Sequence, residues 1–168
     1  ISVGKHAGDG GHSQADINAL LVTLASQGKR VVRLKGGDSF VFGRGGEEIE
    51  ALRAHGIDYE VVPGITAAVA CGAYAGIPLT HRDYSSAVSF VAGQCKGLTE
   101  QDWSGLAGKG RTLVIYMGVA TANAISEKLM ADGVAPEMPV AVLERGTLEG
   151  HRALRTLLAD LGPMVERE

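Results

Sequence analysis

Short apolar runs that end in glycine-containing loops recur along the chain, and they constrain its fold more than any other feature. Glycine makes up 24 of the 168 residues, about twice its usual share. Because glycine destabilises the interior of helices and strands, the excess predicts loops in which the backbone turns sharply or approaches a ligand. The runs and their loops are residues 31–34 with Gly36 and Gly37, residues 59–62 with Gly64, and residues 112–116 with Gly118.

Helical patterns alternate with these apolar runs. Strands that alternate with helices of this length predict βαβ units and a mostly parallel sheet, so the fold class is α/β. The polar segment 78–86 divides the chain almost in half, and we expect two small α/β lobes, residues 1–83 and 84–168. The predicted helices are residues 15–26, 45–54, 65–74, 120–131 and 154–161, and the predicted strands are residues 30–34, 59–62, 87–92, 112–116 and 140–143.

Charge and residue spacing exclude several classes of protein. With 16 basic and 19 acidic residues the formal net charge is −3, which argues against a general nucleic-acid binder. Cys71 and Cys95 have neither zinc nor redox spacing, and the histidines form no HxxxH pair, so we expect no metal. Residues 61–79 carry no charge but are broken by Pro63 and Pro78, which favours a packed loop and helix over a membrane span. We expect a cytoplasmic protein that binds neither nucleic acid nor membrane.

The loop at residues 35–46 directly follows the first predicted strand. Its glycines let the backbone approach a ligand, and Asp38 adds a carboxylate that suits a hydroxyl pair or an ammonium group. The alternative is that Asp38 only caps the helix that follows. The loop matches neither the phosphate-binding GxxxxGK[ST] pattern nor a clean GxGxxG after a strand, so a nucleotide-binding module is disfavoured.

Two further loops follow predicted strands. In residues 61–68 a strand ends in Pro-Gly and a helix begins at once, and the free N–H groups of a helix start bind anions or carboxylates. Thr66 either donates its hydroxyl group to a ligand or caps this helix. Met117, at the end of another strand, either packs against a flat ring or belongs to the core.

Read together, these loops resemble the uroporphyrinogen-III C-methyltransferase family of the tetrapyrrole methylase superfamily. The likeness covers almost the whole chain, and long motifs in the same order are a specific signal. The matching motifs are VVRLKGGD at residues 31–38, FVFGRGGEE at 40–48, VPGITAA at 62–68, AYAGIPLTHR at 73–82, YMG at 116–118 and ERGT at 144–147.

The resemblance implies an activity, a fold and a partner. The family transfers methyl groups from S-adenosylmethionine to two pyrrole carbons of uroporphyrinogen III. The product, precorrin-2, forms by way of precorrin-1 and feeds sirohaem and cobalamin synthesis. The implied fold is two α/β lobes with the cofactor between them, usually in a homodimer. Since this fold is unrelated to the Rossmann-like methyltransferases, the missing GxGxxG pattern agrees with it.

The resemblance also assigns roles to individual residues. Lys5 matches a lysine proposed as proton donor, and the alternative is a solvated lysine at a strand end. The substrate carries eight carboxylates, for which Arg33, Lys35, Arg44, His81 and Arg82 are basic candidates. The positions that match cofactor contacts are Gly36, Gly37, Asp38, Val41, Thr66, Ala67, Met117 and Gly146.

Two departures from the family pattern leave alternatives open. Ser39 stands where the family normally has proline, which would fix the φ angle of the loop. The family's first strand and loop would precede Ile1, and a last strand is expected near the other end, so we expect both lobes to be incomplete and the isolated chain to be weakly active or inactive. The alternatives are a methylase of another tetrapyrrole or corrin intermediate, and an inactive fragment that supplies a dimerisation or binding surface.

Overall fold

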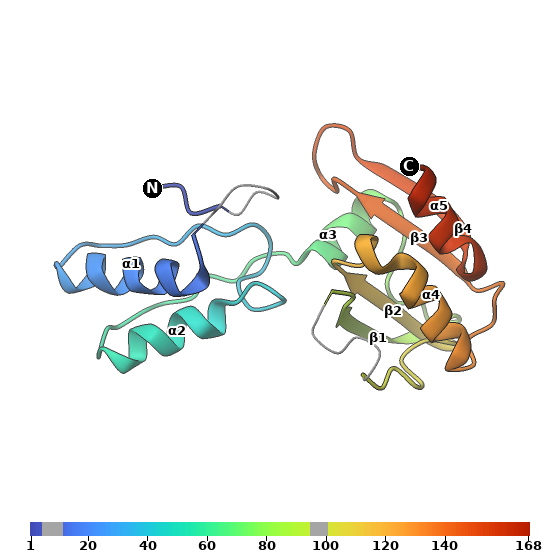
Figure 1. The fold of residues 1–168 in the computed structure, drawn as a ribbon, viewed down its shortest axis with the longest axis horizontal. Helices are drawn as coiled ribbons and strands as arrows, with labels where there is room; N and C mark the ends of the chain where they lie inside the picture. Colours follow the sequence, from blue (N-terminus) through green and yellow to red (C-terminus); the bar gives the residue numbers. More distant parts are fainter. Residues whose placement is uncertain (5–11, 95–100) are drawn as a thin grey trace. The chain divides into compact units, whose positions relative to one another are not determined.

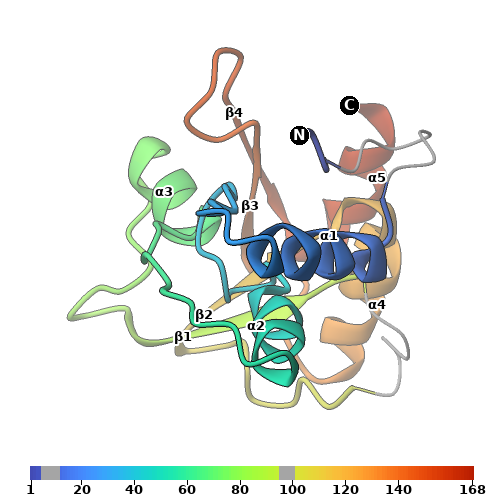
Figure 2. The same ribbon diagram turned by 90° about the vertical axis from the view of Figure 1, so that its left-hand side faces the viewer.

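The computed structural model describes residues 1–4, 12–94 and 101–168, which form two compact units. The first unit is Ile1–Thr66 and the second is Ala67–Glu168. In the first unit, helices α1 (Gln14–Ser26) and α2 (Gly45–Ala54) lie side by side (Figures 1 and 2). The lobe boundary between residues 83 and 84 stays a prediction.

The start of α1 shows why this helix was predictable. The Ser13 hydroxyl accepts a hydrogen bond from the Asp16 N–H at 3.1 Å, and the Asp16 carboxylate accepts one from the Ser13 N–H at 2.8 Å. This reciprocal capping box satisfies N–H groups that have no partner inside the helix. Ile17 and Leu21 form the buried face. The predictions of α1 and α2 are confirmed to within a residue.

The predicted strands at residues 30–34 and 59–62 are wrong. Both segments lack helix and strand structure, and the described part of the first unit contains no paired strand. Val32 is 81% exposed and Leu34 is 85% exposed, so the apolar side chains of the first segment lie at the surface. An apolar, β-branched run becomes a strand only where a second strand supplies its hydrogen bonds, and none of the described segments does so here.

The second unit contains the strands. Strands β1 and β2 pair in parallel, with Val88 opposite Thr112, whereas β3 and β4 form an antiparallel hairpin with Val142 opposite Leu154. The expectation of parallel pairing therefore holds for only one of the two sheets. In chain order the elements are α3 (Ala67–Tyr74), β1 (Ser85–Ala92), β2 (Gly110–Tyr116), the 3-10 turn η2 (Val119–Thr121), α4 (Ala122–Ala131), β3 (Pro139–Glu144), β4 (Arg152–Leu157), the 3-10 turn η3 (Leu158–Asp160) and α5 (Leu161–Arg167).

The predicted helix at residues 154–161 is wrong in its first half, because residues 154–157 belong to strand β4, whereas residues 158–161 form η3 and the start of α5. Leu154 and Thr156 are half-buried, and Arg155 between them is exposed. This alternation has the period of a strand, and β3 supplies the hydrogen-bonding partner. The apolar residues at 154, 157, 158 and 161 also fit a helical spacing, which is why the sequence pattern misled.

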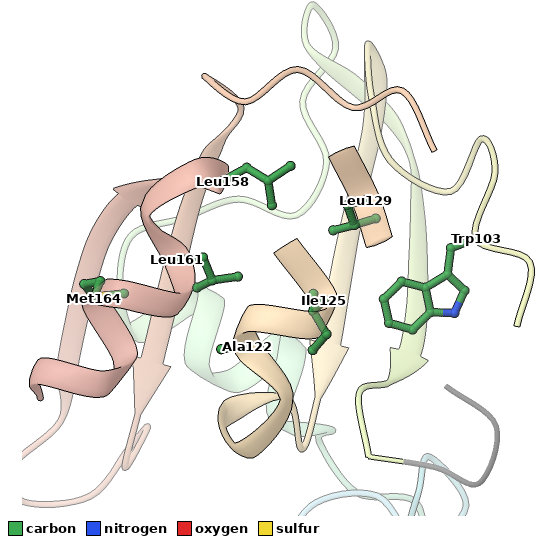
Figure 3. Packing of buried hydrophobic residues seen from close by; sticks show 7 residues of the cluster. All are labelled: Trp103, Ala122, Ile125, Leu129, Leu158, Leu161 and Met164. Atoms are coloured by element: carbon green, nitrogen blue, oxygen red, sulfur yellow. The ribbon is translucent and has the colours of Figure 1, made fainter. Parts of the chain in front are cut away.

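A core of seven buried residues packs α4 against η3 and α5. Ile125 and Leu129 of α4 lie between Leu161 and Trp103 in the view of Figure 3. The Ser126 hydroxyl donates a 2.6 Å hydrogen bond to the Leu158 carbonyl, which satisfies a buried polar group within this core. Within the described ranges, no helix is long and apolar enough to cross a membrane. The core residues are Trp103, Ala122, Ile125, Leu129, Leu158, Leu161 and Met164.

Truncation of the core tests this packing. Ile125 is 2% exposed, and Ile125→Ala should lower the free energy of unfolding of the second unit by about 2–5 kcal/mol, because it leaves a cavity. Urea unfolding followed by circular dichroism and Trp103 fluorescence measures the change. The matched control is Leu148→Ala, at a side chain of the second unit that is 64% exposed, which should change stability by less than about 0.5 kcal/mol. Equal effects of the two substitutions would contradict the assignment of this core.

Candidate functional site

The carboxylate of Asp38 organises the 35–46 loop from within. Its Oδ1 accepts hydrogen bonds from the Phe40 N–H at 2.8 Å and the Val41 N–H at 2.9 Å. The Val41 and then the Phe40 N–H groups hold the pKa of Asp38 below its ordinary value, and the Gly64 backbone adds to this effect. Asp38 therefore supports the loop from within and does not cap α2, whose N-cap residue is Arg44 and which has no side-chain cap. One of the Asp38 oxygens is already engaged.

The 61–66 segment approaches the same loop backbone to backbone. A Cβ atom at Gly64 would collide with the Gly37 carbonyl oxygen and would lie 3.4 Å from the Asp38 Cα. Only glycine allows this contact, and Gly37 itself has a φ of +75°. The first unit thus brings Gly37 and Asp38 against the segment that carries Thr66. Apart from its two chain neighbours, none of the described residues has an atom within 4 Å of a Cβ added at Gly36.

The start of the 35–46 loop is anchored to α2 by a buried carboxylate. Glu48 is 6% exposed. Its oxygens accept hydrogen bonds from Lys35 Nζ at 3.1 Å, Arg33 Nε at 3.2 Å and Gln14 Nε2 at 3.2 Å. Two of the basic candidates for binding substrate carboxylates therefore already bind a carboxylate of the protein.

The remaining basic candidates differ in their surroundings. Arg44 donates to both Glu47 oxygens, at 2.7 and 2.6 Å, in a half-exposed pair. The His81 ring lies 3.9 Å from the Asp83 carboxylate. Arg82 is exposed and forms no ion pair with any residue that the structure describes. Of the five candidates, Arg82 is the one that is exposed and has no carboxylate partner among the described residues.

In the second unit, strand β2 ends beside the start of α3. The Ala68 N–H donates a 2.9 Å hydrogen bond to the Tyr116 hydroxyl, which satisfies one of the free N–H groups at this helix start. Met117 follows directly, with a φ of +56° and 54% exposure. Met117 is therefore not a core residue. Tyr116, which precedes it, is bonded to α3, the helix that begins at Ala67.

The loop between β3 and β4 packs on the same helix. A Cβ atom at Gly146 would collide with Cys71 Sγ and would lie 3.0 Å from Cys71 Cβ. Arg145 and Thr147 on either side have positive φ angles of 50° and 68°, so a tightly turned loop presents Gly146 to α3. Of the predicted cofactor contacts in the second unit, Ala67 is the first residue of α3, Met117 follows Tyr116, which bonds to α3, and Gly146 packs against Cys71 of α3.

Sequence reasoning missed several residues, and one predicted residue cannot be placed. Lys5 lies outside the described residues. Glu48 and Tyr116 lie within recognised motifs, yet nothing in the residue pattern shows that one is buried and the other bonds to a helix start. Both ring nitrogens of His151 are buried and have no hydrogen-bond partner within the part of the chain that the structure describes. Within the same ranges, no group of three or more His, Cys, Asp or Glu side chains is arranged to hold a metal ion.

A family model described as Tetrapyrrole (Corrin/Porphyrin) Methylases matches residues 2–162. The chain belongs to the tetrapyrrole methylase family. This tetrapyrrole methylase is 56% identical over 167 residues to a siroheme synthase from Tolumonas auensis. It is 54% identical over 166 residues to a siroheme synthase from Pseudomonas fluorescens. The two alignments cover 99% and 98% of this chain but only 36% of each relative, so the chain spans about a third of their length.

Solved structures show the same fold for this tetrapyrrole methylase. A uroporphyrin-III C-methyltransferase from Thermus thermophilus, complexed with S-adenyl homocysteine, matches with a TM-score of 0.75 and 36% identity. The match covers 90% of this chain and 67% of that one. A cobalt precorrin-4 methyltransferase matches with a TM-score of 0.81 over 94% of this chain and 67% of that one, at 23% identity, which bears on the fold alone. The predicted α/β tetrapyrrole methylase fold is confirmed.

The lowered pKa of Asp38 predicts how the 35–46 loop responds to acid. Because the folded-state pKa lies below the ordinary value of 3.8, the carboxylate stabilises the loop fully above about pH 3.8, and this contribution is lost as the pH falls through the folded-state pKa. Amide exchange at Phe40 and Val41 should therefore accelerate at low pH beyond the intrinsic change. An Asp38→Ala variant should exchange faster already at neutral pH. An NMR titration that places the Asp38 pKa at or above 3.8 would contradict the prediction.

The contact between Gly64 and Gly37 predicts that substitution by alanine destabilises the protein at Gly64 but not at a glycine with open surroundings. Gly64→Ala forces a Cβ atom into the Gly37 carbonyl, and overpacking of this kind typically costs about 1–3 kcal/mol. Urea unfolding of the first unit, monitored by amide chemical shifts at residues 37 and 38, measures the loss. Gly46→Ala is the matched control, because a Cβ added there meets no atom of the described residues within 4 Å beyond its own chain neighbours and helix backbone. If the two variants were equally stable, the close approach would not exist.

Proposed function

We propose that the protein is an S-adenosylmethionine-dependent C-methyltransferase that converts uroporphyrinogen III to precorrin-2 by way of precorrin-1. The match to the Thermus thermophilus uroporphyrin-III C-methyltransferase carries this proposal, since it combines 36% identity with 90% coverage of this chain. The siroheme synthase relatives support sirohaem synthesis as the destination of the product. The cobalt precorrin-4 methyltransferase match is too distant to favour a different acceptor.

The residues present suit a cofactor that has an apolar adenosyl part and no phosphate. Met117 is 54% exposed at the end of β2, Val41 is half-buried in the 35–46 loop, and the space around Gly36 is open. A side chain such as Met117 packs well against a flat ring, and glycine leaves backbone groups free to bond polar edges. The cofactor contacts that we propose are Gly36, Gly37, Asp38, Val41, Thr66, Ala67, Met117 and Gly146.

The bound cofactor supplies a methyl group on a positively charged sulfur. The chain's own residues then have to align the acceptor carbon with that methyl group and exclude water. Proton transfers in the tetrapyrrole need an acid and a base, and we propose Lys5 as the proton donor. Because Arg33 and Lys35 are paired with Glu48, Arg82 is the basic residue that we propose for a substrate carboxylate. We propose that the enzyme is a cytoplasmic homodimer.

Methyl transfer tests the proposal directly. The protein, produced at the length that its gene encodes, should transfer two labelled methyl groups from S-adenosylmethionine to each uroporphyrinogen III under anaerobic conditions. Mass spectrometry should detect the singly and doubly methylated products in sequence. Arg82→Gln should raise KM for uroporphyrinogen III more than KM for the cofactor, because it removes one positive charge from the proposed substrate site. Methylation of precorrin-2 but not of uroporphyrinogen III would assign the enzyme to a later corrin intermediate instead.

A further inference from the structure

We infer that Glu48 is a positioning residue that holds the 35–46 loop in its cofactor-binding conformation through Lys35 and Arg33. This inference rests on the proposed function, which makes Gly36, Gly37 and Asp38 of that loop contact the cofactor. Glu48 itself lies in α2 and touches neither cofactor nor substrate in our proposal. Its effect passes through the residues that precede the loop.

The geometry places both ends of the loop on the same helix. At its start, Lys35 Nζ lies 3.1 Å from both oxygens of Glu48, so the residue before Gly36 is fixed to α2. At its end, the Gly45 N–H donates a 3.0 Å hydrogen bond to the Ser39 carbonyl as α2 begins. The glycines between these two anchors have no side chains with which to hold their own conformation. Without the first anchor, the start of the loop would be held only from Gly37 onward, where Gly37 packs against Gly64.

The burial of the cluster explains why the anchor is strong. The side chains of Glu48 and Lys35 are 7% and 11% exposed. A charge pair in such surroundings is screened little by solvent, and removal of Glu48 leaves the charge of Lys35 without compensation. The Glu48 carboxylate accepts from Arg33 Nε and Gln14 Nε2 as well, which ties α1 to the same point. Lys35 therefore has a fixed partner in the protein.

Substitutions on both sides of the pair test this role. In the protein at the length that its gene encodes, Glu48→Gln and Lys35→Met should each raise Kd for S-adenosylhomocysteine and KM for S-adenosylmethionine about tenfold, equivalent to about 1.4 kcal/mol. The kcat at saturating cofactor and KM for uroporphyrinogen III should stay within about twofold. The double variant should bind the cofactor no more than about twofold worse than either single variant, because the two residues act through one contact. Lys35→Arg, which keeps the charge, should restore most of the affinity.

The controls separate positioning from a purely structural role. Glu50→Gln makes the same change at an exposed residue of α2 and should leave both KM values unchanged. A merely structural role of Glu48 would lower the active fraction, and thus the apparent kcat, without raising KM for the cofactor, and that result would overturn the inference. If Glu48→Gln does not fold, as judged by circular dichroism, the comparison of Lys35→Met with Lys35→Arg decides. Failure of the unsubstituted protein to bind S-adenosylhomocysteine would refute the proposed function, whereas tight binding by both the unsubstituted protein and the Lys35→Met variant would refute only this inference.

Discussion

Glycine backbones that pack directly against neighbouring residues fix the loops on which the proposed site depends. These contacts are possible only because glycine has no side chain. Gly64 rests on the Gly37 carbonyl in the first unit, and Gly146 rests on Cys71 of α3 in the second. In each case a loop that is distant in sequence reaches a position that any side chain would block. Within each unit, these contacts therefore fix which residues lie next to the proposed cofactor residues, although the contacting residues come from separate motifs.

Ion pairs within the first unit change the roles that we assign to the basic residues near the loops. From the sequence, Arg33, Lys35 and Arg44 are equally good partners for an acidic substrate. The structure pairs the first two with buried Glu48 and the third with Glu47. In this chain, three of the basic residues near the loop therefore bind carboxylates of the protein. For Arg33 and Lys35 the partner is Glu48, which lies more than ten residues away, so the residues immediately around them do not reveal the pairing.

The fold was predictable where local signals suffice. The capping box at Ser13 and the helical spacing of α1 are properties of a few neighbouring residues, and the predicted helix is confirmed. The predictions for residues 30–34 and for the first half of 154–161 were wrong because the formation of a strand depends on a partner strand elsewhere in the chain. The run at 30–34 has strand-forming residues and no described partner, whereas β4 has a partner in β3 and an apolar spacing that also fits a helix. A short stretch of sequence does not show which strands pair across long distances along the chain.

The residue types at the proposed cofactor positions explain why no single sequence motif pointed to a cofactor site. Three of the eight are glycine and one is alanine, so they offer little or no side-chain chemistry. The carboxylate of Asp38, the strongest polar candidate, is bonded through one oxygen to the N–H groups of its own loop. Recognition of the cofactor by such residues has to rely mainly on backbone groups and on shape, supplemented by apolar side chains such as Met117. At these positions, recognition through the backbone leaves no signature in the side chains, and it constrains instead the long runs of residues that hold the backbone in place. The order and length of the motifs were therefore informative, while the chemistry of individual residues was not.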